Sequence, residues 1–219
     1  MFLNLTARND WTSVLSKKNN SFFYPSAGVS FVPTKAFENF GGDVLTHAKI
    51  SASIVKVGNA AINPYDINDR FISGETAGFP YSTINSFVLD PTLTDMNLKN
   101  EDLISREINI NLEFFKRRIT FDASYYTSKN TDQILQTSPS FASGANVATI
   151  NVGESTSTGL ELDLGLTPIK NDNLTWDIRF GYSAPKTTVE KVTETSVQAA
   201  VGDYLGTAGI AAIAGEQFP

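Results

Sequence analysis

Short segments in which apolar and polar residues alternate recur along the chain. In residues 160–166 every second position is Leu, and the positions between are acidic or Gly. In residues 174–182 large apolar residues alternate with Thr, Asp, Arg and Gly. A period of two places successive side chains on opposite faces of a β-strand, so both segments predict strands with one apolar face.

Further segments alternate in the same way and bring the predicted strands to about seven. They are residues 3–8, 24–32, 48–57, 108–114 and 119–125. Most approach the roughly 9–11 residues that a tilted strand needs to cross a bilayer. The predicted fold class is therefore all-β and antiparallel.

The predicted connections differ in length in a regular way over the second half of the chain. Residues 59–103 and 128–158 form long polar connections, whereas the turns at 116–118 and 168–173 are short. Outer-membrane barrels pair long extracellular loops with short periplasmic turns in this manner. The earlier connections, 10–22 and 33–46, are similar in length and do not follow the rule.

The pattern leaves two architectures open. One is a transmembrane β-barrel segment, an open curved sheet of about seven to eight strands with long extracellular loops. The other is a soluble, secreted β-sandwich that binds carbohydrate, because half-buried sandwich strands also alternate. A second sheet would cover the apolar face in a sandwich but not in a barrel wall. The residues that distinguish the two are Leu160, Leu162, Leu164, Ile178 and Phe180.

Composition narrows the function. The 219 residues contain no Cys, which excludes disulfide frameworks, thiolate metal sites and Cys nucleophiles. Acidic residues outnumber basic ones by 23 to 17, and the basic clusters at 17–18 and 116–118 are short, so no nucleic-acid partner is expected. Neither a signal peptide nor a transmembrane helix is predicted, because the run at 205–214 is about half as long as a spanning helix.

Candidate catalytic residues are few. His47 is the only His and has no obvious partner, which leaves no His-based triad and no multi-histidine metal site. Two carboxylate pairs, Glu161 with Asp163 and Asp122 with Glu113, are expected to share one face of neighbouring strands. Inward carboxylates of this kind are typical of a water-filled lumen, so we do not expect a glycoside hydrolase. The chain is therefore predicted not to be an enzyme.

Candidate metal and cofactor sites are equally weak. The acidic loop at 90–95, with residues 100–102, lacks the Gly and the terminal Glu of a hand-type calcium loop. The glycines at 202, 206, 209 and 215 do not form a phosphate-binding spacing. No cofactor, metal ligand or individual substrate-binding residue is therefore assigned.

Aromatic residues fall into two groups. Those near predicted strand ends are suited to girdles at the two membrane interfaces. They are Trp11, Phe22, Phe23, Tyr24, Tyr125, Tyr126, Trp176 and Tyr182. Phe71, Phe79, Tyr81 and Phe141 lie in predicted loops, where they would stack on sugar rings or pack the loop against itself.

Four ordered motifs carry a family resemblance. They are residues 7–13 with 21–26, 49–59, 122–126 with 131–135, and 151–154 with 159–162. Together they resemble TonB-linked outer-membrane transporters of the SusC/RagA type, found in Bacteroidetes, and the match covers most of residues 3–183. Thr158 replaces an Asn that is usual in the family. Ala184 and Pro185 replace polar residues of a continuing strand, so the last strand is expected to stop early.

The resemblance implies a transporter of the outer membrane that imports oligosaccharides or peptides. Its implied partners are a SusD-like surface lipoprotein, the TonB complex, outer-membrane lipid, and a glycan or peptide substrate. We expect the chain to be a fragment that lacks the plug and the segment contacting TonB. Residues 1–189 are expected to form a partial TonB-dependent receptor β-barrel, and residues 190–219 a truncated loop and strand region of the same barrel.

Overall fold

The computed structural model describes residues 1–74, 86–192 and 212–218, and within these ranges nearly all regular structure is β-strand. One short helix, α1 (Pro33–Ala36), and one 3₁₀ turn, η1 (Phe141–Ser143), interrupt the strands. No helix in the described part of the chain is long and apolar enough to cross a membrane.

Each of the predicted strands is confirmed, and each is longer than predicted. The long strands are β1 (Phe2–Trp11), β2 (Ser21–Phe31), β3 (Leu45–Asn59), β7 (Glu101–Phe114), β8 (Ile119–Thr137), β9 (Val147–Lys170) and β10 (Thr175–Lys191). Short strands that the sequence pattern did not predict are β4 (Phe71–Gly74), β5 (Ser86–Leu89), β6 (Thr92–Thr94) and β11 (Gln217–Phe218).

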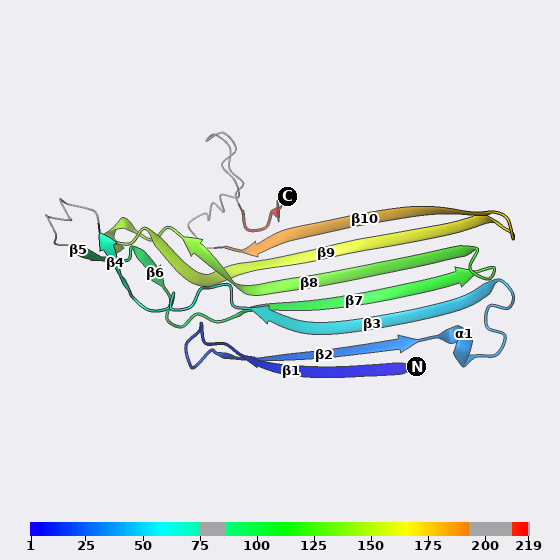
Figure 1. Ribbon diagram of the computed structural model, residues 1–219, viewed down its shortest axis with the longest axis horizontal. Helices are drawn as coiled ribbons and strands as arrows, with labels where there is room; N and C mark the ends of the chain where they lie inside the picture. Colours follow the sequence, from blue (N-terminus) through cyan, green and yellow to red (C-terminus); the bar gives the residue numbers. More distant parts are fainter. Residues whose placement is uncertain (75–85, 193–211, 219) are drawn as a thin grey trace, which may run out of the picture.

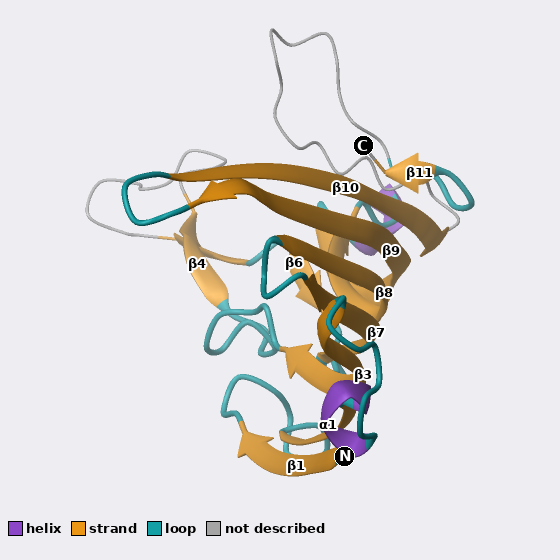
Figure 2. Cartoon of the chain, turned by 90° about the vertical axis from the view of Figure 1, so that its right-hand side faces the viewer, coloured by secondary structure: helices purple, strands orange, loops and turns teal. Residues whose placement is uncertain are grey.

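The seven long strands and the short β11 form one antiparallel sheet in the order β1-β2-β3-β7-β8-β9-β10-β11 (Figure 1). β6 adds to β9 in parallel, and β4 pairs with β5 in a separate hairpin. Figure 2 shows that the sheet follows an arc from β1 to β10. In the described residues no second sheet faces it, which decides for a barrel wall and against a sandwich.

The connections alternate between the two ends of the sheet (Figure 1). At the turn end lie residues 115–118 and 171–174, together with 32–44, which contain α1. At the loop end lie residues 12–20, the long connection from β3 to β7 with its short strands, and 138–146. Residues 32–44 therefore form a longer connection than the two short turns at the same end of the sheet.

Two details of the predicted connections are wrong. Most of the long loop predicted at 128–158 is paired strand, because β8 and β9 run to 19 and 24 residues. Ala148, Ile150 and Val152 alternate there with Thr149, Asn151 and Gly153, but residues 154–158 are all polar and interrupt the pattern. Pro185 does not end β10 but pairs opposite Gly159. A Pro is tolerated there because β10 has no described partner on its other side at this position.

The buried core lies at the loop end of the sheet, where residues of β2 pack against residues of two connections. Leu15, Phe22, Tyr24 and Leu98 form it, and Leu98 is fully buried. Phe22 and Tyr24 are each only 8% exposed, so the prediction that they belong to a membrane girdle is wrong. They instead hold the connection from β1 to β2 against the connection from β3 to β7.

A close contact between two strands depends on the absence of a side chain at Gly159. A Cβ added at this position would overlap the ring of Tyr126, which lies directly opposite on β8. The ring therefore covers the glycine backbone and joins β8 to β9. The same alternation that places Tyr126 over Gly159 points it away from the apolar face, so Tyr126 does not belong to a girdle either.

Replacing Gly159 by Ala should destabilise the folded barrel by about 1–3 kcal/mol, because the methyl group overlaps Tyr126. The urea midpoint in detergent micelles measures the effect. Gly28→Ala is the matched control, since the nearest atoms to its added Cβ lie at 3.8 Å. The Gly159→Ala effect should shrink in a Tyr126→Ala background, and equal losses in the two glycine variants would contradict this account.

Candidate functional site

One face of the sheet is apolar across neighbouring strands. In the paired register one row contains Phe180, Leu164, Phe121 and Leu112. The next row contains Tyr182, Leu162, Ala123, Ile110 and Ile50. Phe180 is 57% exposed and Ile108 is 53% exposed, and no described element covers this outer face. Apolar side chains uncovered over such a width require an apolar surrounding medium.

The opposite, inner face is polar and charged. Near the turn end it contains a hollow of about 540 Å³ whose polar lining includes His47, Lys49, Asn111, Glu113, Arg117, Thr120, Asp122, Asp163 and Arg179. Asp122 lies between its cross-strand neighbours Asn111 and Asp163, and accepts a hydrogen bond from the Asn111 amide at 2.7 Å. Glu113 forms an ion pair with Arg117 at 3.2 Å. Cations and carboxylates thus alternate on a surface that suits water.

The carboxylates predicted to share a face do so. Glu161 and Asp163 are two residues apart on β9, and Asp122 and Glu113 lie on the same side of β8 and β7. His47 lies opposite Glu113 on this inner face, near the turn end. The hollow therefore has the chemistry of a polar channel wall.

A second polar cavity, of about 660 Å³, lies at the loop end. Its polar lining consists of Asn63, Asp66, Asn68, Arg70, Asp90, Thr92, Thr94, Gln136 and Thr149. β8 and β9 supply one side, and the connection from β3 to β7, which includes β6, supplies the rest. The sequence pattern did not predict this cavity, because its residues come from distant segments of the chain that no motif connects.

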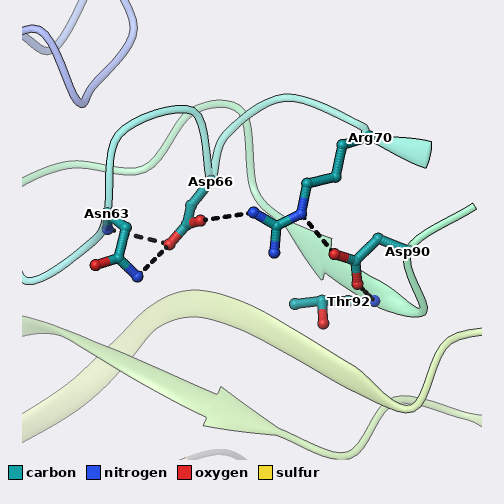
Figure 3. Close-up of polar contacts among 5 residues, drawn as sticks. All are labelled: Asn63, Asp66, Arg70, Asp90 and Thr92. Carbon is teal, nitrogen blue, oxygen red and sulfur yellow. Dashed lines mark hydrogen bonds and ion pairs between the residues drawn. The ribbon is translucent and has the colours of Figure 1, made fainter. Parts of the chain in front are cut away.

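Arg70 is held in this cavity by two carboxylates (Figure 3). Its Nε donates to Asp90 Oδ2 at 2.6 Å, and its Nη1 donates to Asp66 Oδ1 at 3.4 Å. Asp90 also accepts the backbone N–H of Thr92 at 3.0 Å, and Asp66 accepts the backbone N–H of Asn63 at 3.0 Å. Through these two carboxylates, the Arg70 guanidinium links the backbone at Asn63 with the backbone at Thr92.

The ion pair also shifts the protonation equilibria of its members. The hydrogen bond from Arg70, followed by that from the Thr92 backbone, lowers the pKa of Asp90. The pKa of Arg70 is raised, chiefly by the hydrogen bond and the charge of Asp90. Asp90 therefore loses its charge, and with it the ion pair that holds the loop, at a lower pH than an ordinary Asp carboxyl group does.

The acidic residues weighed as a calcium site have other partners. Asp90 binds Arg70, Asp95 accepts the backbone N–H of Asn97 at 2.8 Å, and Asp102 pairs with Lys56 at 2.7 Å. No cluster of three or more metal-binding side chains occurs among the residues that the structure describes. The geometry thus gives no support to the calcium alternative.

The loop aromatics are only partly described. Phe71 lies on β4 and is 72% exposed, and Phe141 begins η1. Phe79 and Tyr81 lie outside the described residues, as do the glycines at 202, 206 and 209. Phe71 does not line the loop-end cavity, so the structure does not support sugar stacking by this ring at that site.

Two asparagine side chains hold the segment that leads into β7. The Asn19 amide donates to the carbonyls of Asn97 and Leu98, at 2.8 and 3.0 Å. Asn151 donates to the carbonyls of Lys99 and Asp132, and its Oδ1 accepts the Lys99 N–H at 2.8 Å. Asn151 belongs to a motif that carries the family resemblance, and its role here is to fix loops rather than to contact a ligand.

A curved antiparallel sheet with an apolar outer face, a polar inner face and membrane-length strands defines the wall of a transmembrane β-barrel. The family model described as TonB dependent receptor-like, β-barrel matches residues 2–212, and the chain belongs to this family. The resemblance found in the sequence is thereby confirmed. Members of this family are barrels of the outer membrane and act as receptors or transporters rather than enzymes.

Curated relatives come from Formosa agariphila. The chain is 30% identical over 205 residues to TonB-dependent receptor P3, a match that covers 91% of this chain and 20% of that protein. It is 27% identical over 223 residues to TonB-dependent receptor P26, covering 99% of this chain and 22% of that protein. The chain therefore spans about a fifth of the length of these relatives.

A solved structure shares the fold. The RagAB peptide transporter matches with a TM-score of 0.76 and 19% identity, over 88% of this chain and 21% of that chain. The RagAB peptide importer in its "open-open" state gives a TM-score of 0.76 and 18% identity, over 88% of this chain and 20% of that chain. At this identity the likeness concerns the fold alone.

Asp90→Asn should loosen the connection around Arg70, because it removes the charge that holds the guanidinium. Trypsin cleavage after Arg70, followed by mass spectrometry at neutral pH, should become about two- to fivefold faster. Asp69→Asn is the control, since Asp69 is exposed and adjacent to Arg70. Equal rates in the two variants would show that the ion pair does not order this connection.

Proposed function

We propose that these residues form part of the wall and the extracellular loops of an outer-membrane transporter that imports oligosaccharides or peptides. The observation that carries the proposal is the separation of apolar and polar residues onto opposite faces of paired strands. One face meets lipid, and the other lines a water-filled path. Residues 1–189 supply the barrel part, and residues 190–219 a further loop and strand region, which the pairing of β11 with β10 supports.

The chemistry of the polar surfaces supports a polar cargo that binds by hydrogen bonds. The turn-end hollow balances Lys49, Arg117 and Arg179 against Glu113, Asp122 and Asp163. The loop-end cavity offers amide and hydroxyl groups around an arginine whose charge is already neutralised. Both surfaces can exchange hydrogen bonds with sugar hydroxyls or peptide groups without trapping a strongly charged solute. We assign neither surface a catalytic role.

Two partners complete the proposal. A SusD-like surface lipoprotein would cover the loop end, and the TonB complex would supply the energy for import. The hairpin of β4 and β5 supports the first partner, because Phe71, Phe87 and Leu89 on it are 72%, 69% and 53% exposed. Large apolar side chains exposed together on a loop are typical of a protein interface.

Deletion of the gene tests the import function. The deletion strain should fail to grow either on neutral oligosaccharides as the sole carbon source or on peptides as the sole amino-acid source. Growth should return when the gene is restored. Free monosaccharides and amino acids are the control and should support normal growth. Unchanged growth on both panels would refute the proposed function.

The lipoprotein partner is tested by replacing Phe71 and Phe87 together with Ser in the intact receptor. Co-purification of the lipoprotein should fall about tenfold, since aromatic residues at the centre of an interface contribute most of its affinity. Phe40→Ser is the control, because Phe40 is also exposed, at 45%, but belongs to the connection at the turn end. Retention of the lipoprotein by the double variant would contradict the assignment of this hairpin.

A further inference from the structure

The outer face contains a hollow of about 510 Å³ whose exposed lining is almost entirely apolar. Gly28 and Ser53 belong to its lining, and so do two small apolar residues, Ala27 on β2 and Ala52 on β3. Their larger cross-strand neighbours are Ile54, Val29 and Ile108, which also line the hollow. Two alanines among long aliphatic side chains leave a recess on a surface that faces lipid, and a flexible hydrocarbon chain fits such a recess.

Arg106 lines the same hollow and precedes Ile108 on β7, the strand that begins at the loop end. It lies on the apolar side of β7, two residues before Ile108 in the sequence. Its cross-strand neighbours are Ile54 and Thr127. Its side chain is exposed. On β8, β9 and β10 the row of Arg106 continues with Thr127, Thr158 and Lys186, so the apolar band ends at this level on these strands.

Two cations on this face, on the strands that flank β7, have carboxylate partners. Lys56 pairs with Asp102 at 2.7 Å, and Lys129 pairs with Glu154 and also lies near Glu190. Among the described residues Arg106 forms no ion pair. An unpaired cation at the lipid surface of a barrel is destabilising unless an anion or water meets it. The lipid phosphates at the end of the hydrocarbon layer are anions at the required depth.

We propose that Arg106 and the hollow beside it bind one lipid of the surrounding membrane that carries an anionic phosphate headgroup. The phosphate accepts hydrogen bonds from the Arg106 guanidinium, for which a planar guanidinium is well suited. An acyl chain of the same lipid lies in the hollow over Ala27 and Ala52. This proposal requires only that the chain belongs to an outer-membrane barrel family, and it holds whatever solute the transporter imports.

The test uses the intact receptor in detergent, titrated with phosphatidylglycerol and followed by native mass spectrometry. The first lipid should bind more tightly than later ones, and diacylglycerol with the same acyl chains should bind at least about tenfold more weakly, because it lacks the phosphate. Addition of inorganic phosphate should leave the lipid bound. Displacement by inorganic phosphate would refute the contribution of the hollow.

Two pairs of variants separate the headgroup from the acyl chain. Arg106→Gln should weaken the first binding step about tenfold, whereas Arg179→Gln, the same change on the inner face, should not. Ala52→Leu fills the hollow and should weaken the first binding step by a similar factor. Ala123→Leu adds the same group to the outer face at a position that does not line the hollow, and should leave this step unchanged. Unchanged binding in either test variant, or equal loss in its control, would refute the site.

Discussion

The antiparallel backbone pairing from β3 to β10 is the constraint on which the other features depend. In lipid every backbone N–H and C=O must be bonded within the protein, so each strand must pair along its whole membrane length. The register of that pairing then decides which side chains meet lipid. With Phe121 opposite Leu164 and Asp122 opposite Asp163, the apolar and the charged residues of this part of the sheet lie in separate rows on opposite faces. A slip by one residue in β9 would bring Asp163 to the apolar face, which the hydrocarbon layer strongly disfavours.

The same strands build the loop end once they extend beyond the apolar band. β8 and β9 remain paired there, but the pairing is irregular around Asp132 and Gln133. Asp132 takes a positive φ of 55°, and the backbone N–H of Ile134 is bonded by the Glu101 carboxylate at 2.8 Å instead of a ladder carbonyl. A bulge of this kind turns the strands and re-aims their side chains. Ile134 and Gln136, just after it, line the cavity that contains Arg70.

The sequence predicted the strands wherever one face of a strand is apolar and the other is polar over several residues. Alternation between Leu and polar residues revealed the membrane part of β9, because one face of this part is apolar throughout and the other is not. It did not reveal residues 147–159 of the same strand, since residues 154–158 are all polar and only a short alternating stretch precedes them. The loop-end cavity was also beyond prediction, because Arg70 and Asp90 are brought together by a long connection and not by a motif. The core around Leu98 likewise depends on contacts of Asn19 across 79 positions of sequence.

The two arginines outside the channel wall illustrate how the neighbouring charges determine what each can bind. Arg70 is bonded to Asp66 and Asp90, so its surroundings carry no excess positive charge, although the cavity still offers hydrogen-bond donors. Such a site is suited to a neutral polar solute and disfavours an anion. Arg106 has no carboxylate partner among the described residues and lies beside an apolar hollow. Its charge is therefore available to an anion, and because the hollow adjoins lipid, that anion is best supplied by a molecule that is itself amphipathic.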